Sequence, residues 1–444
     1  MTRLNFRSAQ EYLTDIYFAL LMTALVFTVS KAGYMELSNA KWPVFLYLSA
    51  GYTGAVILLH LVELLRGECS VSRILDAVNN SSWMQRFLVL FLLFTLTSAA
   101  LSQYPTEAWL GGSRKEGALT IGLYILSCLL ISMNGRPKAW MVHLLAITVT
   151  AQCVICILQL RGGNPLHLYP AGMNYFDANQ SYSGVYLGTI GNADFLGAYF
   201  CLVLPILWVS LLRMKTRWRF AYLIPLLLGL YVAARMWVLS CVVGVAVGFV
   251  IALPIVFPAQ KKTRRQIALA LMLAAFLALL AICLFDFGGP FHALHALLHG
   301  QLPREIDSGR VYIWREVLRR VPEHLLFGTG PDTLSMAGIE PFRRFDEELG
   351  VMLQAGIDTA HCEYLNVLYH QGLLALMANL AALSAALWMW LRSARERPAS
   401  AILGAAVLAY VIQAGFNISV FIPASLFWAV LGLLDGCTKK AKGP

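Results

Sequence analysis

The chain has 444 residues, of which 59% are hydrophobic and only 13% are charged, and its formal net charge is +10. Ordinary globular chains carry roughly 25% charged residues, so soluble domains of this composition would lack polar surface. A disordered chain would be poor in apolar residues, and a secreted disulfide scaffold would be short and rich in cysteine. The composition therefore predicts a polytopic membrane protein with one fold extended over many helices.

Twelve apolar segments are long enough to be membrane-spanning helices, which need about 20 mostly apolar residues. The first lacks a small-residue cleavage site, so we expect it to remain a span and not a removed signal peptide. The predicted fold class is an all-α membrane protein with about 12 transmembrane helices. The segments are 14–31, 43–65, 86–103, 117–133, 139–160, 194–212, 218–234, 236–258, 266–285, 363–391, 400–417 and 419–436.

Lysine and arginine are concentrated in alternate connections between these segments. If the N-terminus is cytoplasmic, every short inner connection is basic, for example 213–219, 261–265 and 392–397. Basic residues are retained on the cytoplasmic side of membrane proteins. We therefore expect both termini in the cytoplasm. Most of the positive charge then reflects topology, and it implies no nucleic-acid partner.

The connection from residue 286 onward is the longest, and we expect it on the outer side. It divides one integrated membrane domain into 1–285 with nine spans, the extracytoplasmic loop 286–362, and 363–444 with three spans and a basic tail. Loops of this length usually carry function or structure of their own.

Within this loop the pattern predicts an amphipathic helix that ends near Arg320, before Pro322. Asp307 or Ser308 is the expected N-cap. The apolar residues at helical spacing are expected to face the membrane surface; they are Val311, Trp314, Leu318 and Val321.

Every basic residue of the long loop is an arginine, although its acidic residues are more numerous. Arginine suits bidentate recognition of phosphate or carboxylate. We favour a functional role for Arg310, one turn before Trp314. Ordinary salt bridges, such as Arg319 with Glu323, are the alternative; we favour this alternative for Arg319, Arg320, Arg343 and Arg344.

Arg235 is surrounded by apolar residues in LYVAARMWVLS, at the outer end of a predicted span. A charged side chain at that depth is costly and indicates a functional site, in a cavity or beside a partner. The alternative is that the side chain extends to the outer interface without a chemical role.

His361 lies where the long loop returns to the membrane, in DTAHCEYLNVLYHQG. An imidazole with a pKa near 6.5 is suited to act as a general base at neutral pH. Asp358 and Glu363 are close enough in sequence to orient it. The alternatives are a capping or interfacial histidine, and for His370 a structural role is favoured.

Three further patterns have two interpretations each. His292, His295 and His299 share a helical face that suits a metal or simply the membrane interface. The GTGPD turn at 328–332 could bind an anion through backbone N–H groups or be a plain turn. Asn192 and Asp194 could cap a helix or line a polar site.

Several stretches together resemble the superfamily of O-antigen ligases and O-antigen polymerases. These membrane enzymes transfer glycans from polyprenyl diphosphate carriers. The stretches are GTIGNADFLGAYFCLVLPILW (188–208), AARMWVLS (233–240), SGRVYIWREVLRRVPEHLLFGTGPDTL (308–334), AHCEYLNVLYHQGLLALM (360–377), FNISVFIPASLFWAVLGLL (416–434) and, in an early outer loop, YPTEAWLGGSRKEGALT (104–120).

The resemblance carries over residue by residue. The family's arginine at the outer start of a span falls on Arg235, and its loop arginine before a tryptophan falls on Arg310, with Trp314. Its histidine at the return to the membrane falls on His361. Two departures from the family concern substrate contacts. The family often has Ser-Arg-Gly where this chain has Ala234-Arg235-Met236, and it often has an asparagine where this chain has Asp194.

The resemblance implies a fold of the GT-C type and inverting glycosyl transfer without a metal or other cofactor. Arg235 and Arg310 would bind the diphosphate, and His361 would take the proton of the acceptor hydroxyl. The donor would be a glycan on undecaprenyl diphosphate or a similar carrier, and the acceptor a glycan, lipid or protein. The enzyme would lie in the bacterial cytoplasmic membrane, with its site on the outer face. Substrate-binding residues would be Trp314, Arg315, Asn192, Asp194 and Glu363.

Two alternatives to a ligase follow. A polymerase of the same superfamily would share these motifs and differ in using a second lipid-linked repeat unit as acceptor. A transporter or flippase of lipid-linked glycans is an alternative of another class. Transporters place polar residues and broken helices near the bilayer midplane, whereas here the candidate residues collect at the outer face.

Overall fold

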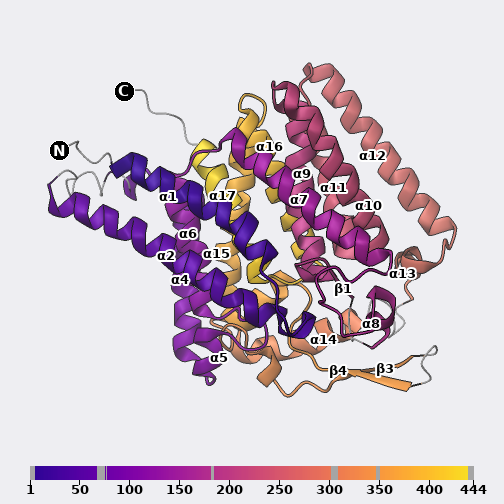
Figure 1. Cartoon of the computed structure of the whole chain (residues 1–444). Coiled ribbons are helices and arrows are strands. Elements are labelled where there is room, and N and C mark those ends of the chain that lie inside the picture. Colours follow the sequence, from indigo (N-terminus) through magenta and orange to yellow (C-terminus); the bar gives the residue numbers. More distant parts are fainter. Residues whose placement is uncertain are drawn as a thin grey trace.

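The structure is a computed structural model that describes residues 6–67, 76, 78–181, 185–301, 309–346 and 351–438. Helices dominate it, and each of the twelve predicted apolar segments coincides with a helix (Figure 1). Within the described ranges, nine helices are long and apolar enough to cross a membrane, and α6 and α16 are shorter apolar helices. The all-α polytopic class is therefore confirmed.

The helices that match the predicted segments have these bounds. The first, α1 (Phe6–Leu20), begins earlier than the predicted segment and continues as the π-helical turn η1 (Leu21–Leu25). The others are α2 (Leu37–Leu65), α4 (Trp83–Leu101), α6 (Ala118–Asn134), α7 (Ala139–Leu160), α9 (Ala193–Arg213), α10 (Leu223–Met236), α11 (Leu239–Val256), α12 (Lys261–Leu284), α15 (Glu363–Ser393), α16 (Pro398–Ala414) and α17 (Phe421–Thr438).

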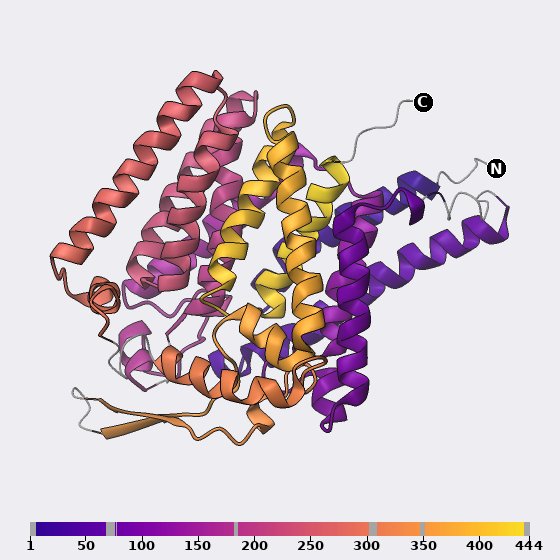
Figure 2. The same cartoon turned by 180° about the vertical axis from the view of Figure 1, so that it is seen from behind.

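The centre of the bundle consists of α9, α16 and α17, which are buried along most of their length. Small residues allow this close packing; a Cβ added at Gly248 of α11 would lie 2.8 Å from the Cβ of Ala409 in α16. By contrast, α12 stands at the edge of the bundle and has no buried residue (Figure 2). A helix that is apolar and unburied is suited to face lipid.

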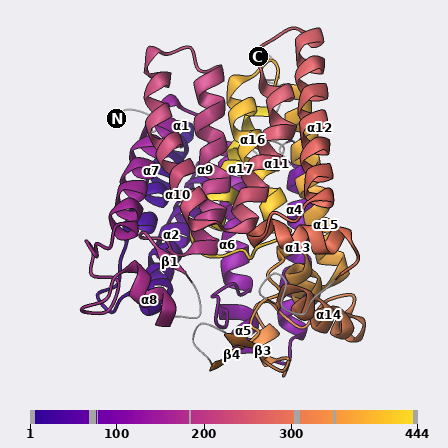
Figure 3. The ribbon, with the colours of Figure 1, turned by 90° about the vertical axis from the view of Figure 1, so that its right-hand side faces the viewer.

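The molecule has two ends along the bundle. The first turn of α1 and the last turn of α17 lie at one end, which we call the terminal face (Figure 1). The segment between α12 and α15 lies at the other, which we call the site face (Figures 1 and 3). It contains α13 (Gly289–Leu298), α14 (Arg310–Arg320), the 3-10 turns η5 (Val321–His324) and η6 (Leu334–Met336), and strands β3 (Phe342–Asp346) and β4 (Val351–Ala355).

The two strands form an antiparallel hairpin in which Phe342 lies opposite Ala355. A smaller antiparallel pair, β1 (Tyr186–Leu187) with β2 (Gly191–Asn192), precedes α9. Short helices α5 (Pro105–Leu110) and α8 (Tyr175–Ser181) and the 3-10 turns η2 (Tyr34–Glu36) and η3 (Arg217–Tyr222) complete the described structure. The predicted long loop thus contains helices as expected, together with a hairpin that the sequence pattern did not indicate.

Helix α14 ends where predicted but buries a different face. Its buried residues are Arg310, Ile313 and Val317, whereas Val311 is 40% and Leu318 is 52% exposed. Ile313 and Val317 form a small core with residues before and within α15. Another face of α14 thus packs against protein, and the orientation of Val311 and Leu318 toward the membrane surface stays a prediction. The residue before it is Gly309, with φ 82°, and the predicted caps Asp307 and Ser308 lie outside the described residues.

The GTGPD turn docks against a break in α15. The helix is interrupted at Gly372, where φ is 86°. The N–H of Gly330 donates to the carbonyl of His370 at 2.8 Å, and the N–H of Leu373 donates to that of Leu325 at 2.7 Å. A Cβ at Gly328 would lie 2.3 Å from the backbone of His370. Since Thr329 also donates to a carbonyl of α15, the structure supports the plain turn over an anion site.

Candidate active site

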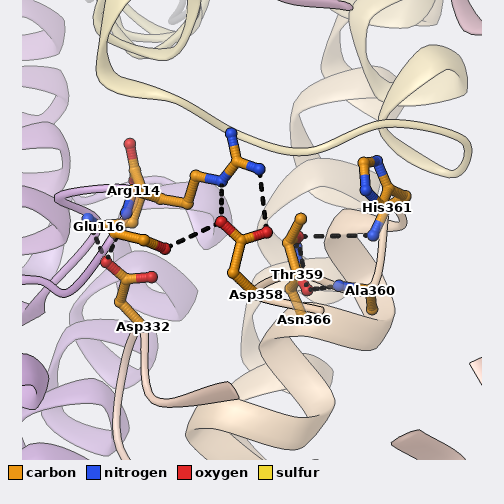
Figure 4. A network of polar contacts seen from close by, with 9 residues as sticks. Arg114, Glu116, Asp332, Asp358, Thr359, Ala360, His361 and Asn366 are labelled. Atoms are coloured by element: carbon orange, nitrogen blue, oxygen red, sulfur yellow. Dashed lines mark hydrogen bonds and ion pairs between the residues drawn. The ribbon is translucent and has the colours of Figure 1, made fainter. Parts of the chain in front are cut away.

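His361 lies on a tight turn that the surrounding residues hold in place. Its φ is +49°, in the left-handed region, which costs a residue with a side chain about 1–3 kcal/mol. The side chain of Asn366 accepts the N–H of Ala360 at 2.8 Å and donates to Thr359 at 3.0 Å (Figure 4). The indole of Trp314 donates to the carbonyl of Ala360 at 2.8 Å. These bonds offset the cost and fix where His361 points.

Asp358, at the start of this turn, forms a bidentate ion pair with Arg114 (Figure 4). The Nε to Oδ2 distance is 2.8 Å and the Nη2 to Oδ1 distance is 2.9 Å. The hydroxyl of Ser113 donates to the same carboxylate at 3.0 Å. Burial alone would raise the pKa of Asp358, but the charge and hydrogen bonds of Arg114, with Ser113, outweigh it and lower that pKa. Asp358 is therefore a carboxylate at neutral pH.

The loop that carries Arg114 is fixed by a second acid. Asp332 accepts the backbone N–H groups of Arg114 at 3.2 Å and Glu116 at 3.3 Å. Burial raises the pKa of Asp332 to about 6. The loop also needs glycine, because a Cβ at Gly117 would lie 2.3 Å from the N atom of Gly111. Arg114 was not among the predicted site residues; its only signal was its place in the GGSRKEG stretch of the early outer loop.

The imidazole of His361 is surrounded by opposing charges. Burial lowers its pKa, Asp194 and Asp358 act to raise it, Arg310 and Arg114 act to lower it, and the net result is a lowered pKa. Its buried Nδ1 has no hydrogen-bond partner among the residues that the structure describes. His361 is therefore neutral at neutral pH, as a general base requires.

The expected orientation of His361 by Asp358 and Glu363 is not seen. No hydrogen bond joins either carboxylate to the imidazole in the described part of the chain. Asp358 is engaged by Arg114, and Glu363 accepts the N–H of Ser419 at 3.0 Å. Glu363 instead lines a cavity that descends between α4, α6, α15, α16 and α17. Sequence proximity suggested these partners, but the turn directs their side chains elsewhere.

Arg310 and Asp194 come from distant elements, yet both lie close enough to His361 for their charges to act on its pKa. Arg310 is buried at the start of α14, and its Nη2 is 4.0 Å from Oδ1 of Asp194 in the first turn of α9. Asn192 caps α9 by accepting the N–H of Asp194 at 2.8 Å. Asn192 thus has the capping role that was one of its two interpretations, while Asp194 contributes charge to the site.

Two predicted residues are not in contact with this group. Arg235, in the last turn of α10, is exposed, and its charge acts on Tyr175 of α8. Arg315 is exposed on α14, away from the buried face. Neither has an ion pair within the described ranges. The structure therefore brings together Arg310, Asp194, His361 and Trp314, and the roles of Arg235 and Arg315 remain predictions.

The three histidines near α13 have separate partners. His292 contacts Asp286 at 2.6 Å, His295 the carbonyl of Ile282 at 2.8 Å, and His299 the carbonyl of His295 at 2.9 Å. Among the described residues there is no cluster of three or more side chains suited to a metal. Their Nδ1 atoms are thus used in local contacts that do not converge.

One protein family matches the chain. Its model, described as O-antigen ligase, aligns with residues 229–380. The matched part runs from within α10 to within α15, so it contains Arg235, Arg310, Trp314 and His361, whereas Arg114 and Asp194 precede it. No curated protein matches the chain.

Proposed function

We propose that this chain, which its residues 229–380 place in the O-antigen ligase superfamily, transfers a glycan from a polyprenyl diphosphate to an acceptor hydroxyl. The observation that carries the proposal is the grouping of a neutral histidine, His361, with a buried arginine, Arg310. Such a pair supplies the two requirements of this reaction, a base for the acceptor and a positive charge for the leaving group.

In the proposed reaction His361 takes the proton from the acceptor hydroxyl. The acceptor oxygen then attacks the anomeric carbon from the face opposite the diphosphate. The new carbon–oxygen bond forms as the bond to phosphate breaks, and the electron pair leaves with the polyprenyl diphosphate. The anomeric configuration is inverted. Diphosphate is a good leaving group, so the reaction needs no acid to protonate it.

Arg310 and Arg235 bind the two phosphates in this proposal and stabilise the charge that develops on them. Since arginine supplies fixed positive charge, we propose that transfer is independent of a metal. Asp194 and Arg114 act on the pKa of His361 in opposite directions and set its basicity, which makes them positioning residues. Trp314 positions the turn through its bond to Ala360.

We propose that the site face is the outer face of the cytoplasmic membrane and that the fold is of the GT-C type. The support is the distribution of charge, because basic residues such as Arg213, Lys215, Lys261 and Lys262 gather where helices end or begin at the terminal face. Residues of this kind mark the cytoplasmic side of membrane proteins.

The test is reconstitution of the purified chain with a polyprenyl-diphosphate glycan and candidate acceptors, with and without a chelator. We expect a new glycosidic bond of inverted configuration at equal rate in both samples. Movement of the glycan across the bilayer without a new bond would contradict the proposal and favour a transporter. A reaction that stops on chelation would contradict the metal-free mechanism.

A further inference from the structure

A second charged region lies on the terminal face, far from His361 along the bundle. It is a cavity of about 820 Å³ between the end of α9, the α11–α12 connection and the α15–α16 connection. Five basic residues and one acid, Glu396, line it. The basic residues are Arg213, Lys215, Arg219, Arg264 and Arg395.

Arg213 and Arg264 of this cavity are held by carbonyl groups. Arg213 donates to the carbonyls of Val256 at 3.0 Å and of Arg395 at 2.8 Å, and Nε of Arg264 donates to that of Pro254 at 2.6 Å. These acceptors are at or just beyond the ends of α11 and α15, where a helix presents unpaired carbonyls. A carbonyl orients a guanidinium without cancelling its charge.

The positive charge of the cavity is therefore not compensated. Arg213, Arg264 and Arg395 all line the cavity, and the charges of the other two act on Arg264. Within the described ranges, none of these three arginines forms an ion pair with a carboxylate, Glu396 included. A guanidinium has five N–H donors, and Arg264 uses only Nε in the contacts above, so its terminal nitrogens can bind an anion.

An apolar slot adjoins the basic cavity. It has a volume of about 180 Å³ and lies between α1, α7, α9, α16 and α17. Met214 and Pro398 line both the slot and the cavity, so the two share a wall. The charged residue of the slot, Lys138, is already paired with Glu11 at 2.7 Å and Asp15 at 2.5 Å. The positive charge of Lys138 is thus compensated, unlike that of the adjoining cavity.

We propose that the cavity and the slot together bind one anionic phospholipid, with its phosphate on Arg264 and Arg395 and part of an acyl chain in the slot. Basic pockets between helices on the cytoplasmic side are suited to lipid headgroups. A free phosphate would share the headgroup chemistry but would leave the slot empty. The site is distinct from the glycosyl-transfer site and does not depend on it.

The test uses the delipidated full-length chain and three probes, which are phosphatidylglycerol, phosphatidylcholine and inorganic phosphate. Retained lipid is counted by native mass spectrometry, and the melting temperature is measured with each probe. We expect phosphatidylglycerol to be retained and to raise the melting temperature, and the other two to do neither. An equal effect of phosphatidylcholine, or an equal rise with inorganic phosphate alone, would overturn the assignment.

Matched variants locate the site. Replacing Arg264→Gln and Arg395→Gln together removes two charges, which is expected to weaken phosphatidylglycerol binding roughly 30-fold. The single variant Arg395→Gln keeps the bond from Arg264 to Pro254, so it controls for misfolding of the double variant. Arg265→Gln, an exposed change on the same helix, should leave binding unchanged. Ala399→Trp, which fills the slot, should also weaken lipid binding. Wild-type binding in the double variant or in Ala399→Trp would overturn the proposal.

Discussion

The arginines near His361 and those of the basic cavity at the terminal face have different partners. At the site face, Arg114 forms a bidentate pair with Asp358 at 2.8 Å and Arg310 faces Asp194 at 4.0 Å. At the terminal face, Arg213 and Arg264 donate to backbone carbonyls. The close bidentate carboxylate partner of Arg114 balances its charge, whereas a carbonyl partner leaves the charge of an arginine available. The partner, more than the arginine, thus determines what each region is suited to do.

The largest effect on the site-face region is expected when His361 is removed, the histidine on whose pKa Arg114 and Arg310 act. His361→Ala is expected to lower the transfer rate by about 10²–10⁴-fold, the usual contribution of a general base. The measurement is kcat in proteoliposomes, with membrane insertion and melting temperature as controls. Unchanged kcat with normal insertion would show that the site-face charges serve another purpose.

The next largest effect is expected at Arg310. Its replacement by alanine should cost about 10²–10³-fold in kcat, because it removes charge stabilisation at the leaving group. Arg310→Lys keeps the charge but loses the planar fork, so it should recover only part of the rate. Equal activity of the lysine and alanine variants would argue against stabilisation of the diphosphate by a positive charge at residue 310.

The pH dependence of activity in two variants tests whether Arg114 and Asp194 act on the pKa of His361. The active imidazole is neutral, so activity falls as pH drops through the pKa of His361, which lies below its ordinary value. Arg114 acts to lower that pKa, so Arg114→Gln should move the acid limb to higher pH. Asp194 acts to raise it, so Asp194→Asn should move the limb to lower pH. Reduced rates without shifts in the pH profile would indicate merely structural roles.

The smallest effect is expected at Arg315, which is exposed and contacts none of the charged residues at the site. Arg315→Gln should raise the KM for the donor by up to about tenfold and leave kcat unchanged, because uniform binding affects KM alone. Arg319→Gln, an exposed change on the same helix, is the matched control. A fall in kcat specific to Arg315→Gln would place this residue in the chemical step.

Most of the fold could be predicted from the sequence, because apolar segments of spanning length and basic connections are local signals. The face of α14 that packs against protein could not be predicted, since Val311 and Ile313 are equally apolar and only tertiary packing selects between them. The hairpin was missed because FRRFD is short and mostly polar. For α14 the deciding contacts come from residues before and within α15.

The candidate site shows the same division. His361 and Arg310 were predicted from local features, the first because it lies where the long loop returns to the membrane and the second because it precedes Trp314 by one turn. Arg114 was missed because it lies 244 residues from the carboxylate that it pairs with. Asp358 and Glu363 were expected to orient His361 because they are neighbours in sequence, yet each is held by another group.

The most direct test of the account is chemical rescue of the His361→Ala variant in proteoliposomes that contain the lipid-linked donor. Added imidazole can replace a missing base but not a missing structural contact. We predict that imidazole restores part of the transfer rate in this variant, with a pH dependence that follows its own titration, and has no effect on Arg310→Ala. Wild-type activity of His361→Ala without imidazole, or equal rescue of both variants, would contradict the role of His361 as the base.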